Sequence, residues 1–257
     1  MYNATLAKKI KITDSLYIYF VKPDSGVQNF ISGQYVALGL FPESPRPECF
    51  PIEENPPKPE KLIKRTYSIG SSPEEKDSYE FFLAIVPTGT LTSRLVMLNE
   101  GDRIYCADKV VGKFTITEIP ENRNLIMVST GTGIAPFISM LRTGTTFTRD
   151  RKITLVYGAR YKTDFAYLDE LEKLKNKYPQ FSYHTTLSRE GLDWQGNRGY
   201  VQNFFVENKI LVDPNKDNVL LCGNPGMVEE VEKIMLARGF VLHSNKVQGN
   251  LHLEKYW

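Results

Sequence analysis

Short runs of aromatic and β-branched residues recur through the first part of the chain, each bounded by glycine, proline, serine or aspartate. Such runs predict β-strands. The clearest cover residues 15–21, 34–40, 79–86 and 113–117. Residues 91–98 are the one short helical candidate in this part, and the proline-rich, charged residues 41–64 predict a surface loop. The pattern favours an antiparallel β-barrel or sandwich.

After Pro120 the pattern changes to an apolar strand, a turn and an amphipathic helix, repeated along the chain. Strands are predicted at residues 124–129, 153–157, 181–186 and 219–222. Repeated βα units of this length predict a doubly wound parallel sheet covered on both faces, with ligands beyond the carboxyl ends of its strands. We therefore expect two domains, at residues 1–118 and 119–257.

Composition narrows the classes of function. Hydrophobic residues make up 41% of the 257 residues, which is enough for packed cores, and the formal net charge is only +2. That charge is too small for general nucleic-acid binding. Cys49, Cys106 and Cys222 are too few for a disulfide framework or a four-cysteine iron–sulfur cluster, and the three histidines lack metal-ligand spacing. We expect no metal site and no hydrolase chemistry.

The chain shows neither a membrane span nor a signal peptide by its sequence pattern. No apolar stretch approaches the roughly 18 residues that a spanning helix needs. The first twenty residues interleave lysine and threonine with apolar residues, which is unlike a secretory leader. The cytoplasm is therefore the expected compartment, and a monomer the expected form.

Two motifs carry candidate chemistry. Residues 130–136 (TGTGIAP) form a glycine-containing turn between an apolar strand and a helix, where free N–H groups favour phosphate. Residues 65–68 (RTYS) place a cation, an aromatic ring and a hydroxyl on one strand. A guanidinium suits a diphosphate, and a tyrosine ring can stack on a flat heterocycle. Each motif alone is also compatible with an ordinary turn or strand.

Together with five further motifs, these segments make the chain resemble the ferredoxin/flavodoxin–NADP reductases, in particular the compact bacterial type. The motifs, in order, are RTYS at 65–68, VPTGTLTSRL at 86–95, STGTGIAPFISMLR at 129–142, VYGARY at 156–161, LSRE at 187–190, LCGNPGMV at 221–228 and EKYW at 254–257. The resemblance implies an FAD-binding β-barrel followed by an NADP-binding α/β domain. It also implies hydride exchange with NADP(H) and single-electron exchange with ferredoxin or flavodoxin. The loop at 41–64 is longer than the compact pattern leads us to expect.

The resemblance assigns flavin contacts to two segments of the barrel and to the chain end. Arg65 and the turn Thr90-Leu91-Thr92 would hold the FAD pyrophosphate, Tyr67 would pack on the flavin ring, and Ser68 would lie near flavin N5. The implied FAD contacts are Arg65, Thr66, Tyr67, Ser68, Thr90, Leu91, Thr92, Thr132 and Trp257, the last on the adenine. Ser68, Cys222 and Glu254 are the implied catalytic residues, Cys222 through proximity. Glu254 is either a proton relay or a structural hydrogen-bond partner.

The nicotinamide nucleotide would lie on the second domain. The implied contacts are Gly131, Thr132, Gly133, Ala159, Arg160, Ser188, Arg189, Arg198, Cys222, Gly223, Asn224 and Pro225. NADP carries an extra phosphate that arginine binds well, so Ser188, Arg189 and Arg198 favour NADP over NAD. Glu190 is the acidic residue that an NAD site would use.

An acidic carrier would meet a basic face, for which residues 8–11, 58–65 and 149–152 are candidates. These charges are also compatible with ordinary solvated surface. Two alternatives stay open: an NAD(P)H-dependent reductase component for an oxygenase or another acceptor, and a non-catalytic flavin- or nucleotide-binding subunit. The presence of both RTYS and the CGNP segment argues against the second.

Overall fold

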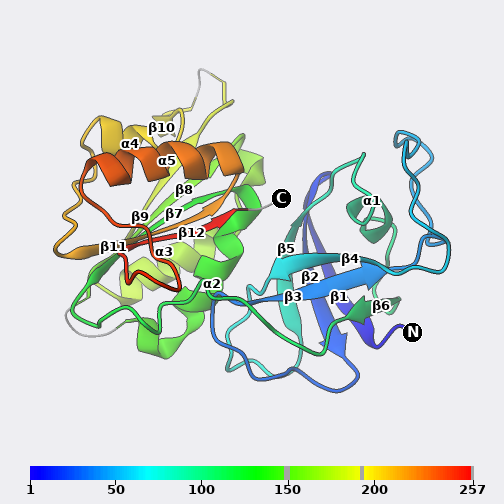
Figure 1. The fold of residues 1–257 in the computed structure, drawn as a ribbon. Coiled ribbons are helices and arrows are strands. Elements are labelled where there is room, and N and C mark those ends of the chain that lie inside the picture. Colours follow the sequence, from blue (N-terminus) through cyan, green and yellow to red (C-terminus); the bar gives the residue numbers. More distant parts are fainter. Residues whose placement is uncertain (148–150, 192–193, 256–257) are drawn as a thin grey trace. The chain divides into compact units, whose positions relative to one another are not determined.

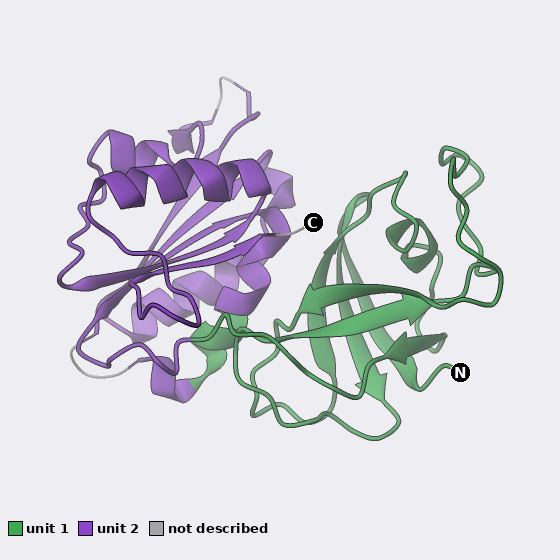
Figure 2. Cartoon of the chain, viewed as in Figure 1, with its two compact units in different colours: residues 1–115, 138–143 green, residues 116–137, 144–257 purple. Residues whose placement is uncertain are grey.

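The computed structural model describes residues 1–147, 151–191 and 194–255. The chain divides into two compact units (Figure 2). Unit 1 comprises Met1–Thr115 and Ile138–Thr143, and unit 2 comprises Ile116–Phe137 and Gly144–Trp257. A short piece from the middle of the chain is thus grouped with the N-terminal unit.

Unit 1 is built on a six-stranded antiparallel sheet (Figure 1). In hydrogen-bonded order its strands are β4 (Ile63–Ser68), β3 (Tyr35–Leu40), β6 (Arg103–Cys106), β1 (Ala4–Thr13), β2 (Leu16–Pro23) and β5 (Tyr79–Ala84). The predicted antiparallel fold class is confirmed. Among the described residues no backbone ladder joins β4 to β5, so the barrel is not closed.

The core of unit 1 holds its short helix α1 (Thr92–Leu95) in place. Tyr19 on β2 is fully buried, and its hydroxyl donates to the Leu95 carbonyl at 2.6 Å. The Lys9 ammonium donates to the carbonyls of Val96 and Leu98, both at 2.7 Å. A cation at the end of a helix also favours its dipole. Two strands therefore fix a helix that is too short to be stable alone.

Two sequence expectations in this unit need correction. Residues 113–117 form no strand, because Phe114 is their only deeply buried side chain and Thr115 N–H turns back to the Lys113 carbonyl at 2.9 Å. Conversely, β1 and β6 were not expected. Lysines are interspersed with apolar residues along β1 because one side of the strand faces solvent. This mixture makes the segment look polar in the sequence, so it was not predicted as a strand.

Unit 2 is a six-stranded parallel sheet, as predicted. In hydrogen-bonded order its strands are β10 (Asn197–Arg198), β9 (Phe181–Leu187), β8 (Ile153–Ala159), β7 (Asn124–Thr130), β11 (Asp217–Gly223) and β12 (Leu251–Lys255). After β7 the chain adds β8, β9 and β10 in turn on one side of β7. It then crosses back and adds β11 and β12 on the other side. The strand order therefore reverses between β7 and β11, and this is where such sheets bind ligands.

Helices cover both faces of this parallel sheet, as right-handed crossovers on either side of β7 require. They are α3 (Leu168–Lys177), α4 (Asn203–Val206) and α5 (Pro225–Ala237), while α2 (Ala135–Arg142) begins in this unit and continues into unit 1. Figure 1 shows α4 and α5 on one face and α3 on the other. Val228 and Val231 of α5 are fully buried and pack in the core between this helix and the sheet. No helix in the described part of the chain is long and apolar enough to cross a membrane.

The part of α2 that belongs to unit 1 makes buried polar contacts there. The Ser139 hydroxyl donates to the Ser71 carbonyl at 2.6 Å. The Arg142 guanidinium donates to the Gly70 carbonyl at 2.9 Å and to the Glu80 carboxylate at 2.8 Å, and the Glu80 side chain is only 4% exposed. The segment Ile138–Thr143 therefore supplies the cation for a buried carboxylate of unit 1.

Candidate functional site

The RTYS segment occupies the C-terminal end of β4. Arg65 and Thr66 are exposed, Tyr67 is half-buried and Ser68 is buried. The Tyr67 ring packs edge-on against Phe81, with ring centroids 6.4 Å apart. Burial raises the pKa of Tyr67, so its ring stays neutral. The strand therefore presents a cation and an uncharged aromatic ring within three residues.

The turn before α1 is closed by a side chain that was predicted to bind phosphate. The Thr92 hydroxyl accepts from the Val86 N–H at 3.2 Å and donates to the Val86 carbonyl at 3.1 Å. Gly89 is required here, because a Cβ at this position would lie 2.5 Å from the Thr92 oxygen. The Thr92 hydroxyl thus shapes the turn. Within the described residues, the main-chain N–H groups of Thr90, Leu91 and Thr92 have no hydrogen-bond partner, and they are the donors left for an anion.

The glycine turn after β7 comes very close to the end of β11. A Cβ on Gly133 would lie 2.4 Å from the Cys222 carbonyl oxygen and 2.6 Å from the Gly223 Cα, both backbone atoms. Gly131 has a φ of +55°, in the region that glycine adopts most readily. Thr132 between them is buried. The glycines therefore serve the strand–turn geometry at the point where the strand order reverses.

The CGNP segment has a structural task for each of its last three residues. Gly223 has a φ of +139°, and a Cβ there would lie 2.6 Å from the Thr130 hydroxyl. That hydroxyl accepts from the Asn224 N–H at 3.1 Å. The Asn224 side chain accepts from two N–H groups of the first turn of α5, and Pro225 is the first residue of that helix. The Asn224 amide oxygen is thus used as a helix cap.

The structure brings together two of the predicted catalytic residues. Cys222 on β11 is opposite Glu254 on β12 in the parallel register. The Cys222 sulfur lies 3.9 Å from a Glu254 carboxylate oxygen, within hydrogen-bond distance for a thiol donor, and Cys222 is fully buried. Trp257, the predicted adenine contact, lies outside the described residues.

The predicted 2′-phosphate residues converge at the carboxyl end of β9. The N–H groups of Ser188 and Arg189 donate to the carbonyls of Ala159 and Arg160 at 3.0 and 2.9 Å, which extends the β8–β9 pairing. In the parallel pairing of β10 with β9, Arg198 is opposite Leu187, the residue before Ser188. The chain therefore places one hydroxyl and two exposed guanidinium-bearing residues on adjacent positions of one sheet edge.

Two carboxylates near this edge are already bound within unit 2. Asp164, which is buried, accepts from the Arg160 Nε at 3.1 Å. Glu190 accepts from the Lys162 N–H at 2.7 Å. The Glu190 carboxylate is therefore used to fix the loop after β8, which weighs against its use on a ribose hydroxyl.

Only some of the basic side chains in the predicted docking segments are exposed and free to meet a partner's charge. Arg151 is 2% exposed and donates to the carbonyls of Ile119 and Pro120, so it presents no charge to a partner. Lys9 is bound to α1, as described above. Lys58 and Lys61 are exposed. Among the described residues, no group of three or more histidine, cysteine or acidic side chains is arranged to hold a metal ion.

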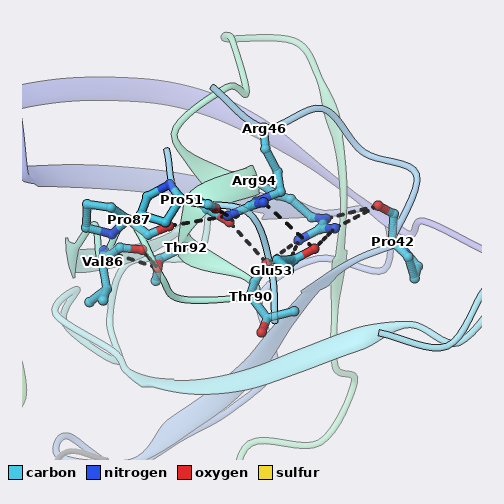
Figure 3. Close-up of polar contacts among 10 residues, drawn as sticks. Pro42, Arg46, Pro51, Glu53, Val86, Pro87, Thr90, Thr92 and Arg94 are labelled. Carbon is cyan, nitrogen blue, oxygen red and sulfur yellow. Dashed lines mark hydrogen bonds and ion pairs between the residues drawn. The ribbon is translucent and has the colours of Figure 1, made fainter. Parts of the chain in front are cut away.

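Sequence reasoning missed one polar cluster beside the Thr90–Thr92 turn. Arg94 on α1 is 4% exposed and forms an ion pair with Glu53 at 2.8 Å, and Arg46 lies next to both (Figure 3). Arg94 lies inside the VPTGTLTSRL motif, but Glu53 is in the irregular loop 41–64, where no periodicity marks it.

Comparison with known proteins gives one consistent result. The oxidoreductase NAD-binding domain family matches residues 127–233. The flavodoxin/ferredoxin–NADP reductase of Buchnera aphidicola subsp. Baizongia pistaciae is 30% identical over an alignment of 262 positions, which covers 99% of this chain and 98% of that protein.

Two solved structures share the fold. A Neisseria gonorrhoeae ferredoxin NADP+ reductase with bound FAD and NADP superimposes with a TM-score of 0.82 at 22% identity, over 98% of this chain and 97% of that one. An Amycolatopsis cytochrome P450 reductase superimposes with a TM-score of 0.78 at 24% identity, over 99% of this chain and 69% of that one.

The two-domain fold and the near full-length likeness confirm the resemblance drawn from the motifs. FAD and NADP, the cofactors expected from the sequence, are those of the family. This chain belongs to the flavodoxin/ferredoxin–NADP reductase family of oxidoreductases.

Proposed function

We propose that the protein exchanges hydride with NADP(H) and passes single electrons to ferredoxin or flavodoxin, with FAD on unit 1 and NADP on unit 2. The observation that carries the choice of NADP is the grouping of Ser188, Arg189 and Arg198 at the end of β9. A dianionic phosphate needs charge-assisted donors, and a hydroxyl between arginines supplies them. FAD, when bound, accepts hydride from nicotinamide C4 at its N5 and releases single electrons.

On unit 1 the chain's own residues would bind FAD and orient its flavin ring. The N–H groups of the Thr90–Thr92 turn and the Arg65 guanidinium are donors for a pyrophosphate, and Thr66 flanks them on β4. The Tyr67 ring provides a neutral face for the isoalloxazine. The Ser68 hydroxyl, buried at the end of β4, would hydrogen-bond near flavin N5.

On unit 2 the residues position the nucleotide and shield the reacting ring. Gly131 and Gly133 allow close backbone approach, and Ala159 and Arg160 lie where the pyrophosphate would pass. The buried Cys222 packs where the nicotinamide would reach the sheet edge, and its thiol donates to Glu254. Burial of Cys222 favours exclusion of water, while Glu254, which is half-buried, would act as a hydrogen-bond partner or as a proton relay.

The first test is the visible spectrum of the purified protein, followed by anaerobic titration with NADPH and, separately, NADH. A flavin spectrum bleached preferentially by NADPH supports both cofactor assignments. A colourless protein that takes up no added FAD would overturn the proposal. Bleaching by NADH alone would keep the flavin and reject the NADP assignment.

Ser68 can be tested separately from cofactor binding. Ser68→Ala should leave FAD bound but slow hydride transfer in stopped-flow reduction by about 10- to 100-fold, the scale of one lost catalytic hydrogen bond. Ser71→Ala removes another buried hydroxyl of the same segment, which accepts from the Glu80 N–H, and it should not change the rate. Equal rates for wild type and Ser68→Ala would remove Ser68 from the mechanism.

A second candidate function is a reductase that serves an oxygenase or another acceptor. The fold shared with the Amycolatopsis cytochrome P450 reductase and the long 41–64 loop beside β4 support it. Reduction rates with purified ferredoxin, flavodoxin and a haem protein, each measured over a range of salt, separate the two candidates. Steep salt dependence with the acidic carriers favours the first. The monomeric state and the cytoplasmic location stay predictions, for light scattering and cell fractionation to test.

A further inference from the structure

A buried cluster of charged side chains binds the proline-rich loop 41–64 to α1. We call residues 42–53 of this loop the strap. The cluster consists of Arg94 on α1 and of Arg46 and Glu53 in the strap, with side chains 5%, 17% and 11% exposed (Figure 3). Burying charges is costly unless their hydrogen bonds are satisfied. Such a cluster in an irregular loop therefore indicates a specific task.

Every N–H of Arg94 has a partner. A guanidinium has five N–H donors, and here they reach three acceptors. The two carboxylate oxygens of Glu53 accept at 2.8 and 2.9 Å, the Pro42 carbonyl accepts twice at 3.1 and 3.0 Å, and the Thr90 carbonyl accepts at 2.7 Å. Arg94 thus has no donor left for a ligand. It acts as a bridge from the strap to the turn before α1.

Arg46 ties the strap to the same turn at a second point. Its Nε donates to the Ser93 hydroxyl at 2.9 Å, and its Nη2 donates to the carbonyls of Pro51 and Pro87 at 3.0 and 3.4 Å. The strap therefore holds the turn directly at Pro87 and Ser93, and it holds Thr90 only through Arg94. It is held from its own side by the Thr92 hydroxyl on Val86, as described above.

The bond from Arg94 to the Thr90 carbonyl has a consequence for the next N–H. In a planar trans peptide the carbonyl and the following N–H point in opposite directions. Arg94 at 2.7 Å, with a longer contact from the Ser93 hydroxyl at 3.4 Å, fixes the Thr90 carbonyl and thereby the direction of the Leu91 N–H. That N–H is one of the three main-chain donors assigned to the pyrophosphate. Glu53, in turn, holds the Arg94 guanidinium in place through a two-point contact, which sets its orientation.

We infer that Glu53 is a positioning residue for the FAD pyrophosphate, acting through Arg94 on the Thr90–Leu91 peptide. This inference rests on the proposed placement of FAD on unit 1. Loss of the Glu53 charge would free the guanidinium to move and the peptide to rotate, so one phosphate donor would no longer be preset. The effect is confined to the phosphate end of FAD, because the strap contacts described here do not include Tyr67 or Ser68.

The test compares Glu53→Gln with Glu54→Gln, which changes the neighbouring, exposed carboxylate. Flavin is removed from each full-length protein, and dissociation constants are measured for FAD and for riboflavin, which has no phosphate. Glu53→Gln should raise the FAD constant about tenfold, which corresponds to about 1.4 kcal/mol, and leave the riboflavin constant unchanged. Glu54→Gln should change neither.

Two outcomes overturn the inference: unchanged FAD affinity in Glu53→Gln, or equal loss of FAD and riboflavin, which would mean a general loosening of unit 1. Circular dichroism of the apoprotein checks folding. If Glu53→Gln does not fold, Arg94→Lys, which keeps the charge but loses the bridge, is measured in the same way and should show the same FAD-specific loss. A wild-type protein that binds no FAD would instead contradict the proposed function.

Discussion

The two segments that we propose to serve phosphate groups, the Thr90–Thr92 turn with its supporting strap and the segment after β9, are built in opposite ways. The strap beside α1 is held by the buried Arg94, whose N–H groups all have acceptors. The segment that follows β9 carries Arg189 and Arg198 exposed to solvent. The first arrangement suits a cofactor that stays bound through many turnovers. The second suits a nucleotide that must bind and leave, because exposed cations, of which Arg198 also donates to the Trp194 carbonyl at 2.7 Å, exchange partners at little cost.

The largest expected effect tests the buried cluster. Arg94→Met leaves the Glu53 carboxylate and two carbonyls without their donor, so it should lower the free energy of unfolding by about 3–5 kcal/mol. Arg103→Met breaks the exposed ion pair with Asp24 and should lower the free energy of unfolding far less, because solvent screens a surface pair. Urea unfolding followed by circular dichroism measures both. Equal losses would mean that the strap is no more tightly held than the surface.

The next effect tests the exposed arginines. The double variant Arg189→Ala, Arg198→Ala should raise the KM for NADPH about 100-fold, since each charge-assisted hydrogen bond contributes about 1.5 kcal/mol. The KM for NADH should stay nearly constant. Lys233→Ala, which removes an exposed cation of α5, controls for overall charge. Equal rises for both nucleotides would reject the assignment of these arginines to the 2′-phosphate.

A smaller effect is expected at the glycine turn of unit 2. Gly133→Ala would place its Cβ against the backbone of Cys222 and Gly223, so the turn must shift, at a cost of about 1–3 kcal/mol. Gly144→Ala has open space around its Cβ and should be neutral. Thermal unfolding gives the stability, and the KM for NADPH reports the shift of the turn. If Gly133→Ala is destabilised but its KM for NADPH is unchanged, this glycine is needed for packing and not for nucleotide binding.

The smallest expected effect is a loss of stability in mild acid that depends on His252. Burial, with the neighbouring His243, lowers the pKa of His252 in unit 2 from 6.5 to about 4. The unfolded chain therefore binds a proton that the folded chain excludes, and stability falls as the pH drops below 6.5. We expect a loss of about 1 kcal/mol between pH 7 and pH 5.5, which His252→Gln should abolish in thermal unfolding.

The carboxylate of the strap should respond only at lower pH. The hydrogen bond from Arg94 holds the pKa of Glu53 below its ordinary value of 4.5. Its contribution is complete above 4.5 and is lost as the pH falls through the lowered value. The unfolding free energies of wild type and Glu53→Gln should therefore differ most above pH 4.5 and converge below it. Convergence at pH 6 would contradict this assignment.

The sequence predicts the parts of the site that local geometry dictates. The glycines of the 131–133 turn and Gly223 are needed wherever two strand ends approach closely, and RTYS reads as a strand. The two-domain fold followed from the change of hydrophobic period. These features depend on residues that are near one another in the chain.

What the sequence could not show depends on distant partners. Arg198 reaches the end of β9 only through the two-residue strand β10, which is too short to leave a pattern. Glu53 meets Arg94 across 41 positions of sequence, out of a loop with no periodicity. The basic run 149–152 indicates an exposed charge at Arg151, but two carbonyl acceptors hold that side chain in the interior.

The inclusion of Ile138–Thr143 in unit 1 bears on how this protein can be dissected. A fragment cut after residue 118 keeps all six strands and the strap. It also keeps the buried Glu80 carboxylate but lacks the Arg142 guanidinium that pairs with it. A carboxylate stripped of its cation in a core is strongly destabilising. A cut after residue 118 therefore does not yield an intact unit 1, and transplanting this unit requires residues 138–143 as well.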